Sequence, residues 1–571
     1  MPDAANSSDP SSRAVRDVAD RYVLALADLD PTTATSLGLR PGEDRLPDLS
    51  PAGQDALDDL ARSTLAALAD AERRSDLDGD ERRCARLLRE RLEAALAMSA
   101  QGEHLRSVSN IFAPPHRVRG TFLDMPAATA DDWAVIARRM ARVATALAQY
   151  RESLQEGASR GLLAGPRVVR AAASQLGEWA AAADGRGWFA DFAAGADVLP
   201  ALRAELDRAA AAANEAVADL ARWLDQEYLP RTADSPDGAG ADRYLVCARR
   251  WTGANLDPLE AYAWGWDQFK YLQRQMSAEA ERVLPGATAR EAMRYLNADG
   301  PAVDGVEEIR AWLQAMMDQA IADLDGTHFD LAEPIKTVEA RIAPRGSAAA
   351  PYYTPPSQDF SRPGRTWLPT SGRTRFPLWN LVSTWYHEGV PGHHLQLAQW
   401  RYLSGDLSMY QTTVGGVSAC GEGWALYAER LMDELGYLDL PGSRLGYLDA
   451  QNLRAIRVVV DIGMHLGLIV PDDSAVGAGR TWTPDLALEF CAAHSGAHKE
   501  FLVSEIIRYL SRPGQAISYK LGERAWLAGR AAARAAHAAS GTAFDPKAWH
   551  MAALSLGSLG LDDLADELAV L

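Results

Sequence analysis

Residues 385–394 read WYHEGVPGHH, which places three histidines, His387, His393 and His394, close to Glu388. The surrounding sequence has the composition of a buried helix. Imidazoles and a carboxylate are costly to bury without partners, and a divalent metal ion is a partner that suits all of them. This stretch therefore predicts a metal site inside a helical protein. The alternative is a core helix, kinked at its Pro-Gly pair, whose histidines bond to backbone carbonyls.

The spacing of these histidines differs from the common zinc helix, in which two histidines stand at i and i+4. Here Pro391 occupies the i+4 position from His387 and is followed by Gly392. On an ideal helix His394 would point about 20° away from His387 but lie roughly 10 Å further along the axis, and His393 would point about 120° away. Pro391 removes a helical hydrogen bond and Gly392 relaxes the backbone, so a local bulge can return one histidine to the site. We expect His393 as the second ligand, with His394 as the alternative; the other would line the pocket.

A third ligand is expected from the segment CGEGWALYAERL. Glu422 lies 29 residues after His393, at the start of a predicted helix. Glu429, two turns later, is the reserve candidate. An acid in a first helical turn can also simply compensate the helix dipole, which is the structural alternative for Glu422.

Two histidines with one glutamate fit Zn²⁺ best, although manganese, cobalt and nickel remain open. His494 and His498 form a second pair, at true i, i+4 spacing, in the segment HSGAH. This pair lacks a neighbouring glutamate, so we interpret it as part of an ordinary exposed helix.

Composition excludes several functional classes. The 571 residues are 47% hydrophobic, enough for a large core, and the net charge of −19 argues against nucleic-acid binding. The four cysteines are far apart and form no CxxC pair, which fits a reducing cytoplasm. No signal peptide is visible, and the most apolar stretch, Ile456–Val470, is too short and too charged to span a bilayer. We expect a cytoplasmic protein without a membrane partner.

Helical periodicity dominates the chain, so the predicted fold class is mostly α. Residues 1–12 are expected to be a disordered tail, 13–240 a helical N-terminal half with a linker at Thr232–Asp242, and 241–571 a second half. One strand is predicted at Ile335–Ala343, followed by a Pro- and Gly-rich loop over 344–376. The helices predicted in the second half are 257–283, 288–297, 305–323, 378–402, 417–435, 445–466, 485–510 and 514–540.

Several motifs together resemble the DUF885 family. They are HEGVPGHH at His387–His394, the EGWALY helix at Glu422–Tyr427, the RxxRxxxDxGxH pattern from Arg454 to His465, RPGQAISYKLG at Arg512–Gly522, and the tandem-tyrosine loop at Tyr352–Pro356. The resemblance covers about residues 240–530. Such proteins are similar in fold to M32 carboxypeptidases and, more distantly, to the M3 and M2 peptidases. The resemblance implies a large helical zincin-like fold with a deep groove between two helical halves, the N-terminal half forming one wall. It also implies a small β-sheet near the metal helix.

The zincin resemblance also implies catalytic roles. Glu388 would be the general base that takes a proton from the metal-activated water and passes it to the leaving nitrogen. Tyr519 and His465 are the candidate donors to the oxyanion. Asp461 lies four residues before His465 on one helical face, and the pair is either a helix-surface pair or a carboxylate that orients the imidazole.

The remaining candidates are assigned to substrate binding. Arg457 and Lys520 are cations that could hold a substrate carboxylate. The Ile335–Ala343 strand could run beside an extended substrate. The full set assigned to the substrate side is His394, Arg457, Asp461, Lys520 and Tyr353.

The leading hypothesis is a metal-dependent hydrolase of peptide or amide bonds, acting on short peptides. The alternatives are the same metal scaffold acting on a non-peptidic small molecule, as a tailoring or detoxifying enzyme, and a catalytically silent helical binding protein. A homodimer is possible. The sequence does not choose between endo- and exo-cleavage.

Overall fold

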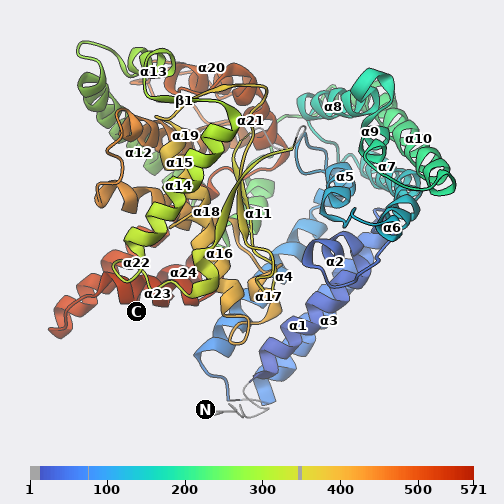
Figure 1. The fold of residues 1–571 in the computed structure, drawn as a ribbon, viewed down its shortest axis with the longest axis horizontal. Coiled ribbons are helices and arrows are strands. Elements are labelled where there is room, and N and C mark those ends of the chain that lie inside the picture. Colours follow the sequence, from blue (N-terminus) through green and yellow to red (C-terminus); the bar gives the residue numbers. More distant parts are fainter. Residues whose placement is uncertain (1–12, 75, 345–349) are drawn as a thin grey trace.

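The chain is mostly helical, as its periodicity predicted, in a computed structural model that describes residues 13–74, 76–344 and 350–571 (Figure 1). The predicted disordered tail, 1–12, and part of the predicted loop, 345–349, lie outside the described residues. The N-terminal helices occupy the right and lower part of Figure 1, and the helices that carry the histidine motif occupy the left. None of the described helices is both long and apolar enough to cross a membrane.

The N-terminal half consists of helices joined by short turns. They are α1 (Ala14–Leu29), α2 (Pro31–Leu37), α3 (Pro51–Arg74), α4 (Gly79–Ala100), α5 (Pro114–Asp124), α6 (Ala130–Met140), α7 (Val143–Ser159), α8 (Pro166–Gly185), α9 (Trp188–Ala194) and α10 (Pro200–Trp223). Helix α10 packs against α6, α7, α8 and α9, and buries a stripe of alanines that lets its neighbours approach closely.

The second half contains the remaining helices and all of the described strands. The helices are α11 (Ala241–Thr252), α12 (Pro258–Val283), α13 (Ala289–Ala298), α14 (Val306–Leu324), α15 (Leu381–Glu388), α16 (His393–Tyr402), α17 (Met409–Thr412), α18 (Ser418–Glu434), α19 (Ser443–Leu466), α20 (Pro484–His494), α21 (Lys499–Ser511), α22 (Ser518–Ser540), α23 (Pro546–Ser555) and α24 (Leu561–Ala569). Several helix starts follow from local chemistry: Asp257 caps α12 by accepting the N–H groups of Leu259 and Glu260, with Pro258 at the first helical position.

Two predicted helices are each interrupted. The predicted helix 378–402 is divided into α15 and α16, and the predicted helix 485–510 into α20 and α21. His498 precedes the first residue of α21 while His494 ends α20, so the two histidines do not share a helical face. The turn between them is held in place because the Gly496 N–H donates to Asp449 on α19, at 3.0 Å.

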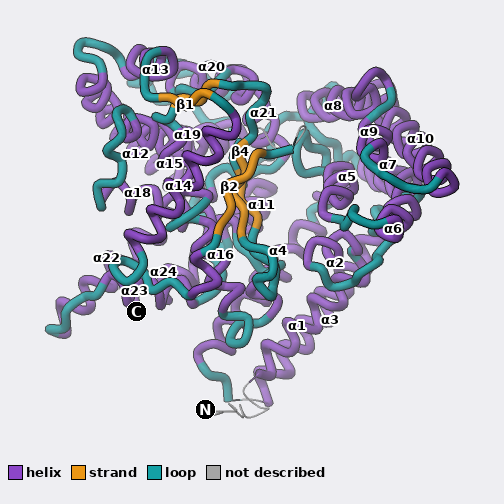
Figure 2. Tube along the Cα trace, viewed as in Figure 1, coloured by secondary structure: helices purple, strands orange, loops and turns teal. Residues whose placement is uncertain are grey.

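The described strands form two small sheets, drawn in orange in Figure 2. β1 (Ala302–Asp304) pairs antiparallel with β5 (Arg375–Pro377). The second sheet has the order β2-β4-β3, with β2 (Val338–Ile342) parallel to β4 (Gly364–Leu368) and β3 (Tyr352–Thr354) antiparallel to it. The predicted strand is therefore present, but the predicted loop 344–376 also supplies strands.

The proposed use of the 335–343 strand as a substrate-pairing edge is wrong. Gln314 on α14 occupies the outer edge of β2, where its side-chain amide donates to the Val338 carbonyl at 2.9 Å and accepts from the Ala340 N–H at 2.7 Å. Two of the outward backbone groups of β2 are thus already bonded to α14, and no residue of β2 lines the cavity that contains the histidines.

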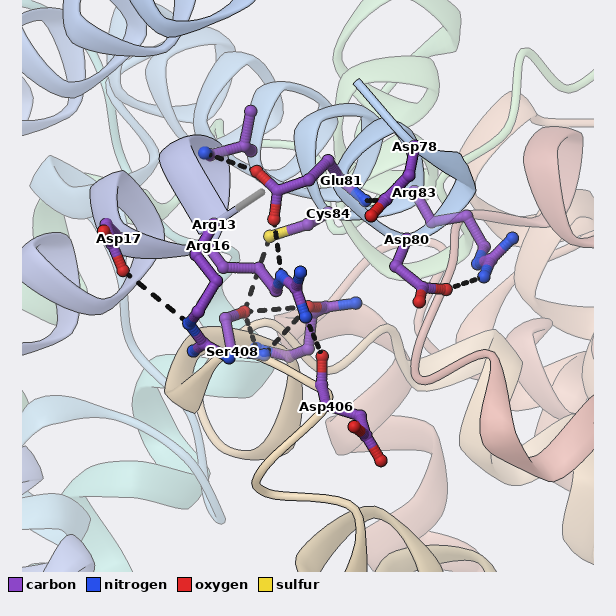
Figure 3. Close-up of polar contacts among 12 residues, drawn as sticks. Arg13, Arg16, Asp17, Asp78, Asp80, Glu81, Arg83, Cys84, Asp406 and Ser408 are labelled. Atoms are coloured by element: carbon purple, nitrogen blue, oxygen red, sulfur yellow. Dashed lines mark hydrogen bonds and ion pairs between the residues drawn. The ribbon is translucent and has the colours of Figure 1, made fainter. Parts of the chain in front are cut away.

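A buried ion pair ties the first helix to the rest of the molecule (Figure 3). Arg16 on α1 donates to Glu81 on α4 and to the backbone carbonyl of Asp406, which precedes α17. Cys84 on α4 contacts Ser408 at 3.4 Å in the same cluster. Segments nearly 400 residues apart are joined there, which helps to hold the two halves in a fixed relation.

Helix α18, which carries Glu422, crosses α22 at backbone contact. A Cβ added to Gly423 would lie 2.4 Å from the Gly522 backbone, and a Cβ added to Gly522 would lie 2.0 Å from the Ala419 carbonyl oxygen. Only glycine fits at both positions. The close crossing fixes the position of Glu422 along α18 relative to Tyr519 on α22.

The predicted linker Thr232–Asp242 is packed against the end of α19. The Ala239 N–H donates to His465 Nδ1 at 3.0 Å, and the Gly240 N–H donates to the His465 carbonyl at 2.9 Å. The segment is therefore a docked connection rather than a free tether.

Candidate metal centre

The histidine motif is positioned by a break in the helix rather than by a kink. Helix α15 ends at Glu388 and α16 begins at His393. The Gly392 N–H donates to the Tyr386 carbonyl at 3.0 Å, which folds the connection back on the end of α15. A Cβ at Gly392 would lie 2.0 Å from the His387 carbonyl oxygen, so this return requires glycine. The break brings His393 beside His387, which is the effect that we predicted for a local bulge at Pro391 and Gly392.

Three predicted ligands come together at this point. Nε2 of His387 lies 3.4 Å from Glu422 Oε2, and Nε2 of His393 lies 3.5 Å from the same oxygen. One ligand atom from each residue lies within 4.8 Å of the others. Nitrogen and oxygen ligands of a tetrahedral zinc ion stand about 3.4 Å apart, given metal–ligand distances near 2.0–2.1 Å. The spacing therefore suits one shared cation.

The chemistry of these atoms also fits a metal ion. Glu422 Oε2 is buried and has no hydrogen-bond partner among the described residues, although it faces two imidazoles. Burial by itself would raise the pKa of Glu422, but His387 and His393 hold that pKa well below its usual range. The group is therefore an anion without a hydrogen bond, at the place where a cation would sit.

Glu429, the reserve ligand, has a different place. His387 Nδ1 lies 2.8 Å from Glu429 Oε1, and the buried carboxylate also accepts from the Ser383 hydroxyl. Arg454 lies 3.6 Å from the same oxygen. With Nδ1 facing Glu429, Nε2 is the nitrogen of His387 that is directed toward Glu422 and is available to a metal ion. Carboxylate–histidine pairs of this kind orient imidazole ligands in metal sites.

His394 is neither a ligand nor a pocket residue in this structure. Its Nε2–H donates to the Ile335 carbonyl at 2.7 Å, and its Nδ1 accepts from the Tyr353 hydroxyl at 2.9 Å. The ring is fully buried, which lowers the pKa of His394 to about 4. Both nitrogens are therefore bonded within the fold. The alternative of His394 as second ligand, and its assignment to substrate binding, are corrected accordingly.

A cavity of about 550 Å³ opens onto the three ligands. Its walls come from Ile111 and Phe112 of the N-terminal half, from residues 350–353, and from α15, α16, α18, α19, α21 and α22. Glu388 lines this cavity beside His387, and burial raises the pKa of Glu388. Tyr353 also lines it, as predicted for the substrate side. The metal candidates thus lie in a cavity of the second half to which the N-terminal half contributes Ile111 and Phe112.

Tyr519 lies in the same wall, as predicted for the oxyanion donor. The Arg457 guanidinium covers its ring, with 4.6 Å between the guanidinium carbon and the ring centre. Burial and the neighbouring charge of Glu422 raise the pKa of Tyr519, so its hydroxyl keeps its proton and can donate.

Three charged residues of this wall were not assigned from the sequence. Arg454, Glu505 and Arg508 line the cavity together with Arg457. Glu505 accepts from Arg457 at 2.7 Å and from Arg508 at 2.7 Å. Arg454 belongs to the RxxR pattern already noted in the sequence, whereas Glu505 and Arg508 show only an i, i+3 pair on a helix.

Three further predicted site residues, besides His394, lie outside the cavity wall. His465 donates from Nε2 to the Tyr509 carbonyl at 3.1 Å while Nδ1 accepts from Ala239, so it is not an oxyanion donor. Asp461 Oδ2 accepts from the Tyr244 hydroxyl at 2.8 Å and from the Gly514 N–H at 3.0 Å. It therefore serves the packing of α19 rather than the substrate.

Lys520 is the third of these residues. Its ammonium group donates to Gln451 at 2.5 Å and to Glu523, and the side chain is fully buried. It cannot reach a substrate carboxylate in the cavity. Lys520 directly follows Tyr519, and consecutive helical residues point about 100° apart, so Lys520 faces away from the cavity that Tyr519 lines.

Comparison with known proteins agrees with this fold. The family described as "Bacterial protein of unknown function (DUF885)" matches residues 31–568. The chain belongs to the DUF885 family. The match extends the resemblance seen in residues 240–530 over nearly the whole chain, including the helical N-terminal half.

Two solved structures share the fold of this DUF885 protein. One is described as the "putative lipoprotein" from Colwellia psychrerythraea, with 22% identity, a TM-score of 0.82 and coverage of 98% of both chains. The other is described as a "putative lipoprotein of unknown function" from Shewanella oneidensis, with 17% identity, a TM-score of 0.71 and coverage of 97% of this chain and 99% of that one. At such identities the likeness shows the fold alone, and the cytoplasmic location stays a prediction.

A carboxypeptidase from Pyrococcus furiosus is more distant, with 13% identity, a TM-score of 0.40 and coverage of 98% of both chains. That likeness is too weak to carry an argument about activity. No curated protein gives a significant match to this DUF885 chain.

Proposed function

We propose that this DUF885 protein is a metal-dependent hydrolase that cleaves peptide or amide bonds in short peptides. The observation that carries the proposal is the buried Glu422 oxygen without a hydrogen-bond partner, 3.4 and 3.5 Å from two imidazole nitrogens, with Glu388 in the same cavity. Two histidines and a glutamate form a known ligand set of catalytic zinc. His387, His393 and Glu422 would hold the ion.

The roles of the surrounding residues follow from their positions. A bound zinc ion would supply a water of lowered pKa and polarise the carbonyl of the substrate. Glu388 takes the proton from the attacking water and returns it to the leaving nitrogen, and its raised pKa suits both transfers. Tyr519 donates from its hydroxyl to the carbonyl oxygen as negative charge develops. Glu429 keeps His387 in the orientation that ligation requires.

The charge of the cavity wall favours a substrate with a free carboxylate. Arg457 and Arg508 share one counter-ion, Glu505, and Arg454 adds a further positive charge. Away from Glu388 and Glu422 at the metal site, the wall therefore carries three arginines against one glutamate. A cavity of about 550 Å³ lies within the usual range for small ligands and accommodates a short peptide. These features support cleavage near a carboxyl terminus.

Hydrolysis of matched dipeptides tests the proposal. Each dipeptide is offered with a free and with an amidated carboxyl terminus, to wild type and to Glu388→Gln, both loaded with zinc. We expect kcat/KM to fall by about 10²–10⁴ in Glu388→Gln while the zinc content is unchanged, and the free-carboxylate peptides to be preferred. Glu434→Gln, an exposed change on α18, is the control.

Unchanged peptide hydrolysis in Glu388→Gln would refute the assigned base. If a zinc-loaded wild-type protein cleaves no peptide in the panel, the peptide substrate is refuted, and the non-peptidic alternative takes its place.

A further inference from the structure

A second cavity, of about 300 Å³, lies beside the first and is rich in arginine. Phe112 lines both cavities. The charged residues of the second cavity are Arg106, Arg243, Arg250, Arg512 and Glu103, so positive charge exceeds negative. Arg512 belongs to the RPGQAISYKLG motif, to which the proposed hydrolysis gives no role.

Arg512 is held between two aromatic rings. Its guanidinium carbon lies 4.2 Å from the centre of the Phe112 ring and 4.3 Å from that of Trp251. Among the described residues its guanidinium group has no hydrogen-bond or ion-pair partner. Because rings cover its two faces, its N–H donors remain at the edge of the plane, where a carboxylate or phosphate binds in a bidentate manner.

Arg250 is the second cation without a partner in this part of the described chain. No acid pairs with its side chain, whereas Arg243 in the same cavity is bonded to Glu103 at 2.6 and 2.8 Å. Burial, with the positive charges of Arg508 and Arg250, lowers the pKa of Arg512 to about 9. Burial, with the charge of Arg91, also lowers the pKa of Arg250. Both side chains are half-buried and lack an acid partner among the described residues, which favours an anion that joins the two guanidinium groups.

We propose that this second cavity binds the carboxylate or phosphate group of an anionic ligand between Arg250 and Arg512. The anion supplies the counter-charge that the described residues do not provide. Its source is either a free small anion or the acidic end of a substrate that passes Phe112 from the first cavity. The proposal does not depend on the metal centre.

Binding of inorganic phosphate and of succinate to the full chain, treated with a chelator so that no metal can bind the anion, tests the proposal by calorimetry. We expect saturable binding of at least one of the two, weakened about 10-fold or more in Arg250→Gln and in Arg512→Gln. Arg524→Gln removes an exposed arginine that pairs with Glu260 and should bind as wild type does.

Absence of saturable binding of both probes at millimolar concentration would overturn the proposal, as would binding that persists in the double variant Arg250→Gln/Arg512→Gln.

Arg250→Gln also serves as the control for folding, because the Arg250 side chain has no bonded partner among the described residues. The thermal unfolding midpoint of this variant should equal or exceed that of wild type. If hydrolysis is established, KM for peptides with an acidic distal residue distinguishes the sources. If Arg512→Gln raises KM only for peptides with an acidic distal residue, the bound anion is the acidic end of a substrate. If KM is equal for acidic and neutral peptides, the bound anion is a free small anion.

Discussion

The bond between His387 Nδ1 and Glu429 determines which imidazole nitrogen is available to a metal ion. Glu429→Gln keeps a hydrogen-bond acceptor in place but removes the negative charge behind the ring. We expect zinc affinity to fall about 10- to 100-fold, the usual effect of losing such an outer partner. Competition with a chromophoric chelator measures it.

Glu434→Gln is the matched control for this change, because Glu434 lies on the same helix, is exposed and pairs with Arg530. Equal zinc affinity in Glu429→Gln and wild type would show that the carboxylate has no part in ligation.

Asp461 predicts a pH dependence of stability. Burial raises the pKa of this carboxyl to about 7, although the hydrogen bonds that it accepts from Tyr244 and Gly514 act in the opposite direction. In the unfolded chain the pKa is about 3.9. The folded state therefore keeps a proton that the unfolded chain releases, and the stability linked to this proton is complete below about pH 4 and is lost as pH rises to about 7.

The free energy of unfolding of wild type, measured relative to that of Asp461→Asn by denaturant titration, should fall by about 2 kcal/mol between pH 5 and 7 and level off near pH 8. The asparagine retains an oxygen that can accept from Tyr244 and Gly514. A difference that stays constant from pH 5 to 8 would contradict the raised pKa.

Residue types and spacing predicted the metal candidates better than they predicted the surrounding residues. His387, His393 and Glu422 stand out because imidazole and carboxylate groups are rare in apolar helices. His465 and Lys520 stand out in the same way, yet each is hydrogen-bonded within the core. The sequence does not show that the backbone of the 232–242 segment would donate a hydrogen bond to His465 Nδ1.

At the scale of elements, the break between α15 and α16 depends on Gly392. Gly392→Ala places a methyl group 2.0 Å from the His387 carbonyl oxygen and 2.4 Å from that of Tyr386. The two helix ends must then separate, at a cost of about 1–3 kcal/mol, and His393 moves away from His387. We expect a lower unfolding midpoint and loss of tight zinc binding.

Gly405→Ala is the control for this substitution, since a Cβ there meets no atom within 4 Å. Unimpaired zinc binding by Gly392→Ala would mean that the break does not position the ligands.

Most helices follow from amphipathic spacing, caps and proline, and their predicted bounds agree with the structure within a few residues. The breaks were harder to predict. Pro391 and Gly392 indicated a disturbance, but the length of the break depends on backbone contacts with Tyr386. The break at Ser495–His498 was less evident from the sequence, because its turn is stabilised by a hydrogen bond to Asp449 on another helix.

At the scale of the whole molecule, the candidate site combines residues from distant parts of the chain. Phe112, Tyr353 and Tyr519 meet in one cavity although they come from the N-terminal half, from the short sheet and from α22. Long-range packing of this kind leaves no periodic trace in the sequence. The resemblance to DUF885 supplied the overall architecture, while the charged wall formed by Arg454, Arg508 and Glu505 required the structure. The homodimer stays a prediction.

Zinc titration of the chelator-treated chain, followed by a competing chromophoric chelator, tests whether His387, His393 and Glu422 bind a metal ion. We expect one tightly bound zinc ion per chain, lost in His393→Ala and in Glu422→Gln but retained in His498→Ala, which removes an exposed histidine. A wild-type chain that binds no zinc, or His393→Ala and Glu422→Gln variants that bind it as tightly as wild type, would contradict the metal centre.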